Sequence, residues 1–160
     1  MPFTISVVGG IYVCLLFIHF FVDFLFQSQQ EAISKHDHPY IRARHCLIYS
    51  FPFLPILFLL RFSFVEVCIA LNILFWSHFA IDTYILTAMW AKYCRKAPEM
   101  FESISEMQTD GTIKIFSLSL KKGLKQYMQT VPGFFLAIVV DQIFHLTILW
   151  VIVLMAMRHI

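Results

Sequence analysis

Three pairs of histidine and aspartate, each spaced i to i+4, stand inside the most apolar stretches of this chain. They are His19 and Asp23, His78 and Asp82, and Asp141 and His145. Residues four apart lie on one face of a helix. An aspartate at the centre of a membrane helix costs about 2.5–3.5 kcal/mol on insertion scales, so such residues usually serve a function. We therefore expect the pairs to face inward from three helices and to share one polar site.

A pair with this spacing can bind one metal ion with both side chains, as in the H-E-x-x-H motif of zinc proteases. A mixture of imidazole and carboxylate suits a divalent transition metal, with zinc or manganese expected first. The predicted metal ligands are His19, Asp23, His78, Asp82, Asp141 and His145. His45, which opens another apolar stretch, is predicted to be a catalytic acid or base, or a further ligand. Either two ions lie side by side, or some carboxylates orient the histidines instead of binding metal.

This chemistry predicts a metal-dependent membrane hydrolase that acts on a lipid or another amphipathic substrate. A bound ion lowers the pKa of water and makes it a nucleophile at neutral pH. Two other classes stay open. The pairs could form a proton or ion path in a small membrane effector or a conducting assembly. They could also be helix–helix contacts in a structural subunit of a membrane complex, although intramembrane polar contacts average only about 0.6 kcal/mol.

The composition places these residues in an all-α integral membrane protein. The chain has 160 residues, of which 59% are hydrophobic and only 14% are charged, and its mean hydropathy is +0.75. A soluble domain of this size needs more charge to cover its surface. We predict one helical membrane domain over residues 1–160, with spans at about 5–27, 45–62, 64–90 and 131–157. Pro52 and Pro55 should kink or break the second span.

Two polar connectors, 28–44 and 91–130, separate the spans, and ten of the twelve Lys and Arg residues lie in them. This bias predicts cytoplasmic connectors and outside termini in a plasma membrane of bacterial type. The four expected spans then place the three pairs in the cytoplasmic half of the bilayer. In the long connector, 98–108 should form a short acidic helix and 112–129 an amphipathic helix whose lysines bind anionic lipid.

Further expectations concern partners. Arg42 and Arg44 are expected to meet lipid headgroups. A homo-oligomer is possible, and the chain carries no nucleic-acid-binding module.

Four segments carry a resemblance to a known family. HFFVDFLFQ from His19 to Gln27 resembles the H-x-x-x-D-F-x-x-Q opening of the bacterial membrane family called "domain of unknown function 3307". RHCLIYS from Arg44, SHFAID from Ser77 and DQIFHL from Asp141 resemble its later motifs. The resemblance implies the four-span fold and a functional role for these motifs, and it implies no activity. The chain departs from the family pattern in 91–130, and Thr83 and Tyr84 stand where members often carry a basic residue.

Overall fold

The computed structural model describes residues 2–94 and 122–159, except for the side chains of residues 2–5, 33 and 131. The chain forms two compact units. The first contains residues 1–82 and 145–160, and the second contains residues 83–144. All regular secondary structure in the described ranges is helical, as the composition predicts. The expected helices at 98–108 and over most of 112–129 lie outside the described residues.

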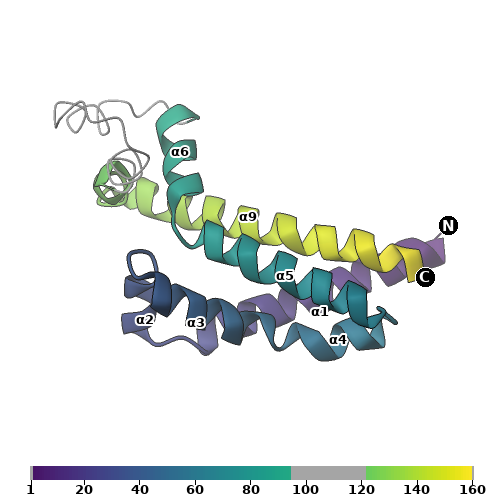
Figure 1. Cartoon of the computed structure of the whole chain (residues 1–160). Coiled ribbons are helices and arrows are strands. Elements are labelled where there is room, and N and C mark those ends of the chain that lie inside the picture. Colours follow the sequence, from purple (N-terminus) through teal and green to yellow (C-terminus); the bar gives the residue numbers. More distant parts are fainter. Residues whose placement is uncertain (1, 95–121, 160) are drawn as a thin grey trace. The chain divides into compact units, whose positions relative to one another are not determined.

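The longest apolar stretches form the longest helices. They are α1 (Pro2–Leu25), α5 (Phe64–Ile81) and α9 (Val131–Ala156), the last followed by a 3₁₀ turn at Met157–His159 (Figure 1). The segments Ser6–Leu25, Phe64–Ile81 and Pro132–His159 have mean hydropathies of 2.1, 1.8 and 2.2. Each is long and apolar enough to cross a membrane. The described residues therefore include three membrane-type helices, at the predicted first, third and fourth positions.

The predicted second span is broken, as its prolines indicate. It consists of α3 (Pro39–Ser50) and α4 (Phe53–Leu59), with a turn at Phe51 and Pro52 between them. Proline has no N–H, so Pro52 and Pro55 cannot donate to carbonyls one turn earlier. The amide of Leu54 instead bonds to the carbonyl of Phe51 at 3.0 Å. Figure 1 shows α4 following α3 along α5, against which both pack.

The predicted third span is wrong at its C-terminal end. We expected one helix from 64 to 90, but α5 ends at Ile81 and Asp82 is its C-cap. Tyr84 then has a left-handed backbone with φ of 60°, and α6 (Ile85–Tyr93) begins directly after it. A non-glycine residue in this region redirects the chain. The apolar run continues across the break, so hydropathy alone could not locate it.

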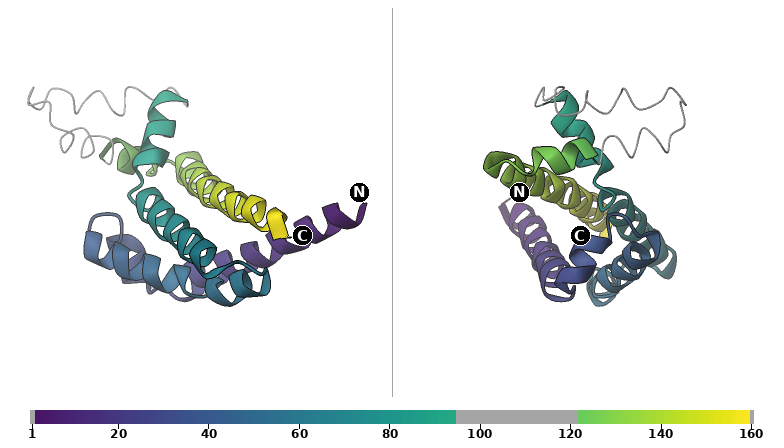
Figure 2. Two further views of the ribbon diagram at one scale, coloured as in Figure 1. Left: turned by 45° about the vertical axis from the view of Figure 1, so that its right-hand side comes forward. Right: turned by 90° about the vertical axis from the view of Figure 1, so that its left-hand side faces the viewer.

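The core of the first unit lies between its membrane-type helices and the broken pair. Leu15 of α1, Phe53 of α4, Leu74 of α5 and Leu149 of α9 are fully buried in one hydrophobic cluster. Figure 2 shows α1, α3, α5 and the C-terminal part of α9 around this interior. The apolar cluster fixes the helices whose polar ends build the site described below.

The second unit has its own small core. Ala88 and Ala91 of α6 are buried with Ala137 of α9 and with Leu124 and Tyr127. The last two belong to a helical segment at 122–127, where Lys122 and Lys125 are exposed. This part of the predicted amphipathic helix therefore has the expected apolar and basic sides.

Candidate metal centre

Four potential metal ligands meet inside the first unit. Asp23 lies near the end of α1, His45 lies in α3, His78 lies in the last turn of α5, and Asp82 caps that helix. All four side chains are buried. These residues are up to 59 positions apart in the sequence, and they meet because α1, α3 and α5 bring them to one place. The predicted inward orientation of the first two pairs is confirmed.

The ligand atoms of these residues crowd around one point. The Nε2 atoms of His45 and His78 are 3.0 Å apart. Asp23 Oδ1 lies 3.1 Å from His45 Nε2 and 3.6 Å from His78 Nε2. Asp82 Oδ2 lies 3.7 Å from His45 Nε2 and 3.4 Å from His78 Nε2. Two nitrogens and two oxygens from four side chains therefore face one another.

These separations match those of a tetrahedral coordination shell. Zinc bonds of about 2.0–2.2 Å in a tetrahedron place neighbouring ligand atoms about 3.3–3.6 Å apart. The five distances given above run from 3.0 to 3.7 Å. The ligand atoms of Asp23, His45 and His78 all lie within 4.8 Å of one another. The residues fit a divalent transition metal in both donor type and spacing.

Hydrogen bonding within the cluster does not satisfy every one of these contacts. His45 Nε2 faces the carboxylate oxygen of Asp23 at 3.1 Å and the ammonium of Lys35 at 3.3 Å. A ring nitrogen either donates one proton or accepts one, so it cannot serve the carboxylate and the ammonium together. Either the lone pairs of His45 and Asp23 or the N–H groups of His45 and Lys35 must then face each other. A cation bound by His45 and Asp23 would remove the conflict between the two lone pairs.

Lys35 is the principal residue that sequence reasoning missed. Its buried ammonium lies 3.1 Å from Asp82 Oδ1 and 3.5 Å from Asp23 Oδ1. It therefore neutralises part of the charge of both carboxylates. Lys35 is the C-cap of α2 (Gln29–Ser34), whose start is fixed by a capping box between Ser28 and Glu31. This S-x-x-E pattern in the first connector is typical of the start of a helix. It therefore predicts the short helix that ends next to Lys35.

Arg42 holds the loop that carries Lys35. Its guanidinium donates to the carbonyls of Lys35 and His36, both at 3.1 Å, and lies 4.4 Å from the centre of the Phe79 ring. Arg42 is buried, and Arg44 pairs with Glu31 on the surface. The expectation that Arg42 meets lipid headgroups is therefore wrong. The Phe79 ring and the two backbone carbonyls stabilise the buried guanidinium of Arg42.

Two more predicted ligands form a layer next to the cluster. The ring of His145 lies 4.4 Å from that of His78, and the ring of His19 lies 5.5 Å from that of His145, both centre to centre. His19 Nδ1 is 3.0 Å from the hydroxyl of Tyr49, whose ring stacks on His78 at 3.8 Å. Within the described part of the chain, Nδ1 of His78 makes no hydrogen bond. Packing against Tyr49 therefore sets the orientation of the His78 ring.

Asp141, the remaining predicted ligand, is buried one turn before His145 on α9 and belongs to the second compact unit. Its role as a ligand stays a prediction. Cys46, which the sequence did not mark, lies beside the cluster, with Sγ within 4.8 Å of ligand atoms of His78 and Asp82. The i, i+4 spacing that identified the three pairs could not identify Cys46, because Cys46 lies in α3, which carries none of these pairs.

Asp82 and His36, at the end of α5, have shifted pKa values. Burial raises the pKa of Asp82, but His78 and Lys35 outweigh burial and hold the pKa below its ordinary value. Burial lowers the pKa of His36, although the bond from its Nδ1 to the backbone carbonyl of Asp82 at 2.8 Å partly offsets this. Asp82 is therefore an anion, and His36 is a neutral ring that fixes the end of α5.

The comparison with known proteins gives one family. The family model described as "Protein of unknown function (DUF3307)" matches residues 11–159, which include all the residues of the cluster. No curated protein and no solved structure matches the chain. The match confirms the resemblance of the four motifs across almost the whole sequence. This membrane-type helical chain, with its buried cluster of aspartate and histidine, belongs to the DUF3307 family.

Proposed function

We propose that this protein binds one divalent transition metal ion, zinc or manganese, through Asp23, His45 and His78. The observation that supports this proposal is the spacing of the ligand atoms, which lie 3.0, 3.1 and 3.6 Å apart. Buried carboxylates beside Lys35 leave negative charge in the cluster, and a cation compensates it. In this assignment His45 is a ligand, which is one of the two roles expected from the sequence.

We further propose that the ion serves hydrolysis of a lipid or another amphipathic substrate. Catalytic zinc sites have three protein ligands and an open fourth position, where a bound water has a lowered pKa. Asp82 Oδ2 is 3.4 Å from His78 Nε2, and Lys35 contacts the other oxygen of Asp82 at 3.1 Å. Asp82 would accept the proton of the water as general base. The ring of His145 would hold the ligand His78 in place, and the ring of His19 would pack against His145.

The proposed topology has four spans. Together α3 and α4 extend from Pro39 to Leu59, which at about 1.5 Å per residue approaches the hydrocarbon thickness of about 30 Å. The charge bias then places both termini outside a bacterial-type plasma membrane, with both connectors and the cluster toward the cytoplasm and the connector lysines at the anionic inner leaflet.

A membrane-impermeant thiol reagent tests this topology. In intact cells it should label a cysteine introduced by Met157→Cys. It should reach native Cys94, which is exposed at the start of the long connector, only after the membrane is permeabilised. Labelling of Cys94 in intact cells would reverse the orientation.

Elemental analysis of purified protein tests the metal proposal, and Asp82→Asn separates binding from chemistry. We expect about one zinc or manganese ion per chain in the unaltered protein. Asp82→Asn should keep most of the ion, because loss of an outer-sphere partner weakens metal affinity by only about 10–100-fold. Asp23→Asn, which is isosteric in the same way, should lose the ion.

Mass spectrometry of vesicles made of phosphatidylethanolamine and phosphatidylglycerol should detect lipid cleavage that Asp82→Asn reduces by about 10²–10⁴-fold.

The alternative with a specific observation in its favour is a proton relay. The rings of His19, His145, His78 and His45 follow one another at 5.5, 4.4 and 5.0 Å between centres. Protein without stoichiometric metal, whose vesicles conduct protons in the presence of a chelator, would establish the relay and reject the metal centre. Stoichiometric metal without lipid cleavage would retain the metal centre and reject this substrate class.

A further inference from the structure

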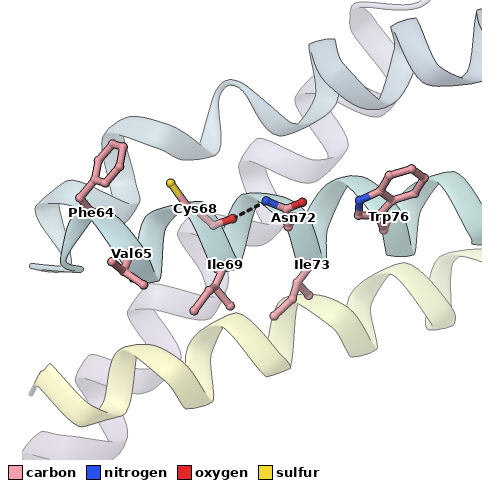
Figure 3. A pocket seen from close by; sticks show the side chains of 7 residues that line it. All are labelled: Phe64, Val65, Cys68, Ile69, Asn72, Ile73 and Trp76. Atoms are coloured by element: carbon pink, nitrogen blue, oxygen red, sulfur yellow. Dashed lines mark hydrogen bonds between the residues drawn. The ribbon is translucent and has the colours of Figure 1, made fainter.

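One polar side chain stands on the outward face of a membrane-type helix. Asn72 lies midway along α5, between Phe64 and Ile81, and it is exposed. Its Nδ2 donates to the carbonyl of Cys68 in the same helix at 2.9 Å (Figure 3). Within the described residues, its Oδ1 accepts no hydrogen bond. Lipid tails offer no partner to an amide, so this group needs one from a protein.

The neighbours of Asn72 form a stripe with the spacing of a helix–helix interface. Val65, Ile69 and Trp76 are 65%, 47% and 60% exposed. With Asn72 they follow one another at four, three and four residues, the repeat that faces a partner in paired helices. Figure 3 shows these side chains along one side of α5, where they line a shallow groove of about 550 Å³.

We propose that this stripe of Val65, Ile69, Asn72 and Trp76 binds the same stripe of a second copy of the chain. Two copies in one membrane have the same orientation, so a two-fold axis along the membrane normal brings equivalent residues together. A carboxamide carries both a donor and an acceptor, so two Asn72 side chains bond to each other reciprocally. One polar residue in an apolar interface also fixes the register of the two helices. The inference is independent of the proposed metal centre.

The dimer is tested with the full chain in lipid vesicles. Energy transfer between labelled copies, measured as protein is diluted into lipid, gives the dissociation constant. Asn72→Leu should raise that constant by about 5- to 30-fold, the range for hydrogen bonds between membrane helices. Ser77→Ala is the matched control, because the Ser77 hydroxyl bonds to the carbonyl of Ile73 in its own helix at 2.6 Å. It should leave the constant unchanged.

The native cysteines give a second measurement of the same interface that leaves Asn72 in place. Cys14, Cys68 and Cys94 are exposed and Cys46 is buried. Cys68 lies one turn before Asn72 in the groove, so it should approach Cys68 of the second copy closely enough for a disulfide. Oxidation with copper phenanthroline should cross-link protein that carries Cys14→Ser and Cys94→Ser, and Cys68→Ser should abolish the cross-link.

Three results would overturn this proposal. A monomer at every dilution would mean that another part of the chain covers this face. A dimer unaffected by Asn72→Leu, or one cross-linked through Cys14 or Cys94 and not through Cys68, would place the interface on another face.

Discussion

Replacing His78 by alanine should remove the metal ion from the purified protein. His78 Nε2 lies 3.0 Å from His45 Nε2, 3.4 Å from Asp82 Oδ2 and 3.6 Å from Asp23 Oδ1. Without it, one of three ligands is lost, and the remaining two residues come from different helices. We expect metal affinity to fall by more than the about 10–100-fold that an outer-sphere partner contributes. Elemental analysis after dialysis should show the metal content drop from about one ion per chain to a trace.

His159→Ala provides the control for this experiment. His159 also belongs to the first unit, but its Nε2 pairs with Glu66 at 3.1 Å, away from the ligand atoms. Its removal should leave the metal content unchanged. His78→Gln keeps a polar side chain of similar size, and it separates loss of the ligand from loss of folding. An unchanged metal content in a folded His78 variant would remove His78 from the ligand set.

Replacing Lys35 by methionine should make the stability of the protein depend on metal. The Lys35 ammonium lies within 3.5 Å of carboxylate oxygens of both Asp23 and Asp82, and all three groups are buried. Methionine keeps the length of the side chain and removes the charge. Breaking a buried ion pair from one side lowers the free energy of unfolding by about 3–5 kcal/mol. In the presence of a chelator, Lys35→Met should therefore unfold at much lower denaturant concentration than the unaltered protein, and added zinc should restore most of the difference.

Arg44→Met is the matched control for the loss of one cation in this region. Arg44 pairs with Glu31, and its side chain is 56% exposed. A surface pair of this kind contributes about 0–1 kcal/mol, so the variant should unfold close to the unaltered protein with or without zinc. If Lys35→Met behaved like Arg44→Met in the chelator, the Lys35 ammonium would not be the charge that stabilises the metal-free cluster.

The sequence predicts much of the site because helical spacing and hydropathy together mark its residues. Asp23, His78 and Asp82 stand out as ionisable groups in apolar runs, and a 3.6-residue turn gives their common face. Lys35 could not be marked in this way, because it lies in a polar connector where a lysine is ordinary. Its partners are 12 and 47 positions away in the sequence, and only the packing of α1, α2 and α5 makes them neighbours.

The limits of the fold prediction have a similar cause. The break of the second span followed from Pro52 and Pro55, because proline cannot continue the backbone hydrogen bonds. The end of α5 at Ile81 did not follow, because Tyr84 and the apolar residues after it carry no turn signal. Hydropathy measures the transfer of side chains to lipid and does not report a local backbone angle. The break ends α5 at Ile81 and makes Asp82 the C-cap of that helix.

The contact between Lys35 and both aspartates has a consequence for how the protein is made. Many small metal-binding domains stay unfolded until their ion arrives, since nothing else neutralises their ligands. Here the chain brings its own cation to Asp23 and Asp82, so under the proposed metal binding the chain would insert and assemble before the ion is bound. Maturation would then be a separate late step that follows the cell's supply of metal, and newly made protein could accumulate in the membrane as an intact precursor.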